Sequence, residues 1–154
     1  METPLIVPGD FAMADDLAPR LRHADADELR ANGREPHAGL LRACLLSSQL
    51  DAIVVAGRPL AIFGFADMGD DTACPWLLGS EDLVTTHRAW FIRHSPAIVS
   101  SGDHRWARFR NRVDARNSVH VRWLRWVGFR VDPPEAFGPF DLPFHSIYRE
   151  APNV

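Results

Sequence analysis

The chain has 154 residues, of which 46% are hydrophobic and 24% charged, and its formal net charge is -3. These values are typical of one soluble globular domain that builds its core without a metal or disulfides. No apolar run approaches the roughly 20 residues that cross a bilayer, and the first residues lack the basic and apolar parts of a secretory signal. Cys44 and Cys74 are the two cysteines, so we expect reduced thiols and no disulfide framework.

The N-terminal half of the chain predicts a strand and two helices, followed by three strands. Leucines recur at helical spacing before Asn32-Gly33, a typical helix stop. Apolar, β-branched runs on both sides of Gly57-Arg58-Pro59 indicate a hairpin. The expected elements are a strand at 5–7, helices at 10–32 and 37–48, and strands at 50–56, 60–66 and 73–78.

The C-terminal half begins with a predicted long helix. Ser80 suits its N-cap, Glu81 and Asp82 suit its first turn, and Pro96 limits its length. The remaining expected elements are a strand at 106–115, a helix at 117–127, a strand at 129–131, a loop at 132–139 and a strand at 144–149. This order predicts a single α/β domain over residues 1–154, with a mixed, twisted sheet flanked by helices.

Charge is distributed unevenly between the two halves. Residues 1–82 hold 14 acidic and 6 basic side chains, whereas residues 83–154 hold 6 acidic and 11 basic ones. Every basic residue is Arg, and tryptophans alternate with arginines near the C-terminus. Such a surface suits phosphate or single-stranded nucleic acid, or a protein partner, or it is a solvated face that pairs with the acidic half. The arginines concerned are Arg105, Arg108, Arg110, Arg112, Arg116, Arg122 and Arg125.

The segment from Asn117 to Phe129 is the most specific motif in the chain. An Asn, about ten helical residues and Gly128-Phe129 lie between two expected strands. This pattern resembles the strand–helix–strand near the C-terminus of GCN5-related N-acetyltransferases, which share the GNAT fold. The order of strands and helices also resembles that family over most of the chain. The resemblance implies a GNAT-like α/β fold and, as an activity, acetyl transfer from acetyl-CoA to an amine.

A narrower resemblance covers about residues 50–148. It rests on three segments in the same order: 57–64, 75–79 and 111–129. Together they are similar to the small internal (core) virion protein family of short-tailed phages, whose members resemble GNAT enzymes in fold. This resemblance implies a non-enzymatic protein that contacts other phage virion proteins, or DNA. It also implies a place in the host cytoplasm during assembly and then in the virion, without secretion.

Two features of a working GNAT enzyme are missing from the sequence. The turn that would hold the coenzyme A pyrophosphate spans 78–84 and has one glycine, Gly79, with no Arg or Gln beside it. Glu81 and Asp82 in that turn would repel a pyrophosphate. Leu124 stands where many GNAT enzymes have a Tyr that protonates the leaving thiolate. His120, one turn earlier, is the candidate acid instead.

The main reading is therefore a phage internal virion or assembly protein without cofactor, and the alternative is an acetyl-CoA-dependent N-acetyltransferase. For the alternative, the resemblance implies that Leu77, Leu78, Gly79 and Asn117 bind the cofactor. For the main reading, the expected partner-contact residues are Arg122, Trp123, Arg125 and Trp126. No metal site is expected, because the chain has no CxxC, no HExxH and no Cys/His cluster at zinc spacing.

Overall fold

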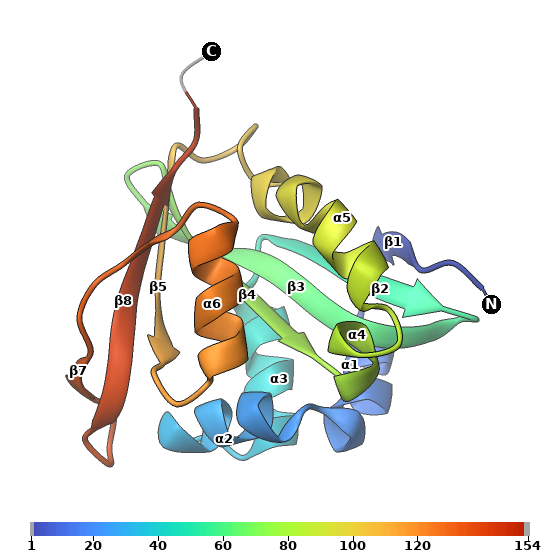
Figure 1. Ribbon diagram of the computed structural model, residues 1–154, viewed down its shortest axis with the longest axis horizontal. Helices are drawn as coiled ribbons and strands as arrows, with labels where there is room; N and C mark the ends of the chain where they lie inside the picture. Colours follow the sequence, from blue (N-terminus) through green and yellow to red (C-terminus); the bar gives the residue numbers. More distant parts are fainter. Residues whose placement is uncertain (1, 153–154) are drawn as a thin grey trace.

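A single mixed β-sheet organises the computed structural model, which describes residues 2–152 (Figure 1). Along the sheet the strands follow the order β1-β2-β3-β4-β5-β8-β6, and β7 pairs with β8. The sheet confirms the predicted α/β fold. Its strands are β1 (Leu5–Pro8), β2 (Gln49–Val55), β3 (Arg58–Gly69), β4 (Thr72–Gly79), β5 (Arg108–Asp114), β6 (Arg130–Val131), β7 (Glu135–Phe137) and β8 (Leu142–Glu150).

The parallel contact between β4 and β5 divides the sheet into two parts. All other strand pairs are antiparallel, whereas β4 and β5 run parallel and are in register only at Thr72 with Arg108 and at Ala73 with Phe109. Beyond these residues the two strands diverge, as Figure 1 shows. The sheet therefore has a wedge-shaped gap between β4 and β5.

Helices cover the two faces of the sheet in separate groups. Helices α1 (Phe11–Leu17) and α3 (Pro36–Leu46) pack on one face of β2 to β4, around Leu17, Leu40 and Ile62. Helices α5 (Arg88–Ser100) and α6 (Ser118–Trp126) lie on the other face, nearer the viewer in Figure 1. Helix α2 (His23–Ala31) passes the end of β4.

Two long helices expected from the sequence are each divided in the structure. The helix expected at 10–32 is broken into α1, a 3-10 turn (Ala18–Arg20) and α2, because Pro19 enters the helix interior and cannot donate a backbone hydrogen bond. The helix expected from 80 begins with a single turn, α4 (Glu81–Val84), and resumes as α5.

Three details of that second helix and of the C-terminal segment correct the sequence predictions. The Ser80 side chain does not cap α4 but donates to the Leu60 carbonyl, 2.9 Å away. Pro96 lies inside α5 rather than at its end. The expected loop at 132–139 contains the short strand β7.

No helix among residues 2–152 has both the length and the apolar character needed to span a bilayer.

The two tryptophans of α6 occupy different environments. Trp123 stacks on Phe91 of α5, and its Nε1 donates to the Ser95 hydroxyl at 2.8 Å. Trp126 is 58% exposed. Val121 and Leu124 form the buried stripe of α6. At about 100° per residue, Trp126 lies opposite this stripe and faces solvent, whereas Trp123 lies on its flank, where it reaches α5.

We expect these two positions to differ sharply in their contribution to stability. Trp123→Ala should lower the free energy of unfolding by about 3 kcal/mol, through lost packing and a lost hydrogen-bond donor. Trp126→Ala, as the matched control, should lower it by less than about 0.5 kcal/mol. Urea denaturation followed by circular dichroism measures both values. Equal losses would contradict the assigned orientation of α6.

Candidate functional site

The gap between β4 and β5 is the candidate site. Asn111 of β5 spans its narrow end, where its Nδ2 donates to the Pro75 carbonyl at 2.8 Å. Backbone N–H and C=O groups along a strand alternate in direction. The backbone groups of Leu77 and Gly79 therefore point to the same side as the Pro75 carbonyl, towards the gap. The backbone groups of Leu78 point the other way, towards β3, where Leu78 is in register with Ile62. The Leu78 amide is therefore not directed into the gap.

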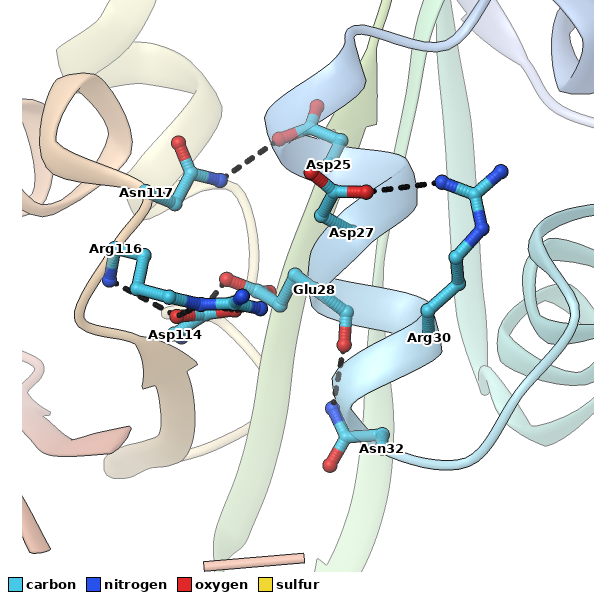
Figure 2. Close-up of polar contacts among 8 residues, drawn as sticks. All are labelled: Asp25, Asp27, Glu28, Arg30, Asn32, Asp114, Arg116 and Asn117. Carbon is cyan, nitrogen blue, oxygen red and sulfur yellow. Dashed lines mark hydrogen bonds and ion pairs between the residues drawn. The ribbon is translucent and has the colours of Figure 1, made fainter. Parts of the chain in front are cut away.

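Asp25 of α2 closes the wide end of this gap. Its side chain is buried, at 2% exposure. One carboxylate oxygen, Oδ2, accepts from the Gly79 amide at 2.9 Å, and the other, Oδ1, accepts from Asn117 Nδ2 at 3.0 Å. Figure 2 shows the contact between Asp25 and Asn117. Because Gly79 ends β4 and Asn117 follows β5, one carboxylate joins the two diverging strands. We call this set of contacts the Asp25 bridge.

The segment before α2 fixes Asp25 in this position. Leu21 forms an isolated antiparallel bridge with Ser80, and the Arg22 amide donates to the Gly79 carbonyl at 2.9 Å. The buried Arg22 guanidinium also donates from Nη1 to Asp25 Oδ1 at 3.1 Å. The carboxylate thus has three hydrogen-bond donors, one of them charged, as a buried anion requires.

Further acidic groups lie behind the Asp25 bridge. Glu28, one turn further along α2, accepts from the Asp114 amide at 2.9 Å, and the buried Asp114 is paired with Arg116 (Figure 2). Burial, opposed by that hydrogen bond and reinforced by the charges of Asp25 and Asp114, raises the pKa of Glu28 to about 8. Glu28 is therefore mostly protonated at neutral pH. Residues 2–152 contain no His, Cys, Asp or Glu cluster with a geometry that could hold a metal ion.

The turn after β4 offers little to a pyrophosphate. The Ser80 amide and hydroxyl both donate to the Leu60 carbonyl, and the Gly79 amide is held by Asp25. Helix α4 has four residues, so few aligned peptide dipoles add up at its N-terminus. Glu81 and Asp82 occupy its first turn, and Glu81 lies 3.9 Å from the Arg22 guanidinium.

Neither Leu124, His120 nor Tyr148, the three positions that the family resemblance raises for a general acid, is ready to protonate a thiolate. Leu124 packs in the core at 3% exposure. His120 contacts Trp123 edge to face, and burial lowers its pKa below the usual 6.5, so its ring is neutral at pH 7. Tyr148 lies on β8 and donates to Glu150, which raises the pKa of the phenol.

The cysteines are not nucleophiles at neutral pH. Burial raises the pKa of both the Cys44 and the Cys74 thiol to about 11. Cys44 is buried and Cys74 half-buried, and both are free thiols in the structure.

An apolar cavity lies on the α5–α6 side of β4. Its volume is about 40 Å³, and Leu77, Trp123 and Leu124 are among its lining residues. Each water molecule needs about 10–15 Å³ by this measure, so the cavity has room for a few waters. A pantetheine arm would require the surrounding side chains to move.

The structure separates the four expected partner-contact residues. Trp123 points into the protein, whereas Arg122, Arg125 and Trp126 are exposed on α6. Neither Arg122 nor Arg125 forms an ion pair with any of residues 2–152.

Sequence reasoning missed the residues that matter most in the gap. It singled out Gly79 and Asn117, and the structure brings both to the gap, but it did not single out Arg22, Asp25 or Glu28. In sequence these three belong to a polar helical stretch that reads as solvent-exposed. The strand-like contact of Leu21 with Ser80 and the backbone bond from Arg22 to Gly79, which have no sequence signature, bring that face to the end of β4.

Comparison with solved structures identifies the fold. No family model matches the chain, and no curated protein matches its sequence. Ard1 from Thermoplasma volcanium superposes with a TM-score of 0.73 at 11% identity, covering 97% of this chain and 99% of that one. A GCN5-related N-acetyltransferase from Kribbella flavida gives 0.67 at 17% identity, covering 96% and 97%. The putative acetyltransferase yncA from Salmonella typhimurium, solved with acetyl-CoA, gives 0.66 at 14% identity, covering 99% and 96%.

The chain has the GNAT fold. At these identities the likeness concerns the fold, and the chemistry depends on the residues in the gap. Those residues do not fit acetyl-CoA as they stand. A carboxylate holds the Gly79 amide and the Asn117 side chain, and two more carboxylates occupy the turn for the pyrophosphate.

The raised pKa of Glu28 predicts a pH-dependent stability. The unfolded carboxyl loses its proton near pH 4.5 and the folded one near pH 8, so the folded state binds the extra proton between these values. Stability should therefore fall as pH rises from 4.5 to 8, with a limiting slope of about 1.4 kcal/mol per pH unit.

Urea denaturation at several pH values between 5 and 8 measures this slope. Glu28→Gln keeps a carbonyl oxygen for the Asp114 amide and should flatten the profile. Asp27→Asn, on the exposed side of the same helix, should leave the profile as in the wild type. A Glu28→Gln profile identical to that of the wild type would disprove the assigned ionisation.

Proposed function

We propose that this chain uses the GNAT fold without acetyl transfer and acts through contacts with other proteins, as a phage-encoded internal virion or assembly protein. The Asp25 bridge carries the non-catalytic part of this proposal. The phage assignment is supported by the sequence resemblance over residues 50–148 alone, and no solved neighbour named above is described as a virion protein. On this proposal the chain is located in the host cytoplasm and later in the virion.

Opening the gap for a ligand would be costly. The Asp25 carboxylate would lose hydrogen bonds from Gly79 and Asn117, each worth about 1.5–3 kcal/mol when one partner is charged. The ligand would also have to leave Asp25 and Arg22 solvated or paired elsewhere. Any affinity for acetyl-CoA is reduced by the fraction of molecules in which this bridge is open.

The entrance to the gap is also electrostatically unfavourable. Like charges about 4 Å apart repel by roughly 1–4 kcal/mol, depending on the local dielectric. Glu81 and Asp82 both lie where a pyrophosphate would approach, and the guanidinium nearest to them, Arg22, is already paired with Asp25. These two carboxylates therefore stabilise the N-terminus of α4 and oppose the binding of an anionic cofactor there.

The outward face of α6 is the surface that we propose for protein contacts. Val119 and Trp126 are 47% and 58% exposed, and they lie two turns apart on the same side of the helix. Arg122 lies between them, and Arg125 is adjacent. Exposed Trp and unpaired Arg are the residue types that most often anchor protein interfaces.

An acetyl-CoA-dependent N-acetyltransferase is the second candidate function. The comparisons favour this candidate over the virion role, because two of the three solved neighbours named above are described as an acetyltransferase or a putative one. One observation at the gap also favours it: Oδ1 of the buried Asn117 has no hydrogen-bond partner among the described residues. If Asp25 swung out, Leu77, Gly79 and Asn117 would present backbone and amide groups to an acyl-CoA.

Calorimetric titration with acetyl-CoA, together with a thermal-shift scan, separates the two functions. A ligand at 100 times its Kd stabilises a fold by about 2.7 kcal/mol. We expect neither heat nor a shift in Tm for the wild type at about 1 mM acetyl-CoA. Clear binding by the wild type would contradict the non-catalytic proposal and support the transferase.

The double variant Glu81→Gln/Asp82→Asn provides the matched arm of this experiment. Because the Asp25 bridge remains intact in it, we expect no binding of acetyl-CoA and a slightly lower Tm from the weakened start of α4. Binding by the double variant alone would show that charge repulsion, rather than the Asp25 bridge, excludes the cofactor.

A further inference from the structure

A second, larger cavity lies on the sheet face opposite α6. Its volume is about 700 Å³, within the range of small-molecule sites. Helices α1 and α3 cover this face only over β2 to β4, and α2 contacts only the end of β5, so most of the part formed by β5, β8 and β6 is not covered by a helix of residues 2–152. The cavity lies on this part, beside Asn32 at the end of α2 and Phe137 of β7.

Three guanidinium groups line this cavity. Arg110 and Arg112 alternate along β5 to the same face, and Tyr148 of β8 lies between Arg110 and Arg130 in the sheet register. Arg110 and Arg112 are exposed and form no ion pair with any of residues 2–152. Arg130 has one acidic neighbour, Asp132, at 3.4 Å.

Aromatic rings hold two of these guanidiniums in place. Arg112 lies over the Phe137 ring at 4.2 Å, and Arg130 lies over the Tyr148 ring at 4.9 Å. Stacking on a ring restricts the long Arg side chain and leaves the N–H donors at its edge free. The arginines are therefore partly ordered before any ligand arrives, which lowers the entropic cost of binding.

We propose that this cavity binds a small phosphate monoester. The lining side chains carry three positive charges and one negative charge, Asp132, in a protein whose overall charge is -3. That local excess of two positive charges matches the dianion of a phosphate monoester. Guanidinium forks bind phosphate oxygens in pairs, and the Ser146 hydroxyl in the same lining supplies a further donor.

Four further arginines of this half are engaged within the protein, which favours one phosphate group over a nucleic-acid backbone as the ligand. Arg116 pairs with Asp114, Arg149 binds Asp103 through two hydrogen bonds, and Arg105 donates to the Ser48 carbonyl. Arg108 likewise donates to the Asp70 carbonyl and to Thr72. A backbone-binding groove needs a continuous row of free cations. Here the free guanidiniums on this face are concentrated at the cavity.

Isothermal titration with adenosine 5′-monophosphate tests this proposal, with adenosine as the matched ligand that lacks the phosphate. We expect the monophosphate to bind with a millimolar or tighter Kd, and adenosine not to bind. Arg110→Gln/Arg112→Gln should weaken binding by at least about tenfold. Arg88→Gln/Arg93→Gln removes two exposed charges from α5 on the opposite face and should change the Kd by less than about twofold. Circular dichroism verifies that both double variants fold.

Three results would overturn the proposal. The first is no binding of the monophosphate at about 5 mM. The second is equal weakening in the two double variants, which would indicate non-specific attraction. The third is a single-stranded DNA of about 15 nucleotides binding more tightly than the monophosphate with the same dependence on Arg110 and Arg112, which would assign the face to nucleic acid.

Discussion

The proposed function depends on the contact between the Asp25 carboxylate and the two diverging strands, β4 and β5. In a sheet whose central pair, β4 and β5, is in register at only two positions, backbone donors at the open end need partners. Asp25 supplies one for Gly79 and holds Asn117 at the start of α6. The short strand-like contact of Leu21 and Arg22 with the end of β4 keeps α2 in place. The gap is thus closed by the chain itself.

The fold and the chemistry of a GNAT protein depend on different residues. The order and pairing of the strands are those of GNAT proteins, and they persist because they depend on the sheet and its three apolar clusters. Acetyl transfer depends on a few polar groups at the gap. Here a leucine is buried at the acid position, the turn after β4 is acidic, and the amide at Gly79 already has an acceptor. The proposal of a role without turnover rests on these residues.

Much of the fold could be predicted from the sequence, because apolar periodicity and the Gly57 turn are local signals. The strand at 73–78 and the helix at 117–127 agree closely with β4 and α6. The breaks at Pro19 and after Val84 were missed, since a polar stretch continues the helical pattern across them. The site was only half predictable. Gly79 and Asn117 follow from a family motif, whereas Asp25 becomes functional through a contact 54 residues away in sequence. The cavity lined by Arg110, Arg112 and Arg130 could not be predicted without the strand register, because β6 and β5 are adjacent to β8 only in the folded sheet.

Hydrogen exchange at the Gly79 amide tests the closed gap most directly. An amide bound to a buried carboxylate exchanges slowly, at a rate set by local opening. We expect strong protection of Gly79 in the wild type, and loss of that protection in Asp25→Ala while amides in the centre of β3 stay protected. Rapid exchange at Gly79 in the wild type, at the rate of an exposed amide, would show that the Asp25 bridge is not formed in solution and that the gap is open.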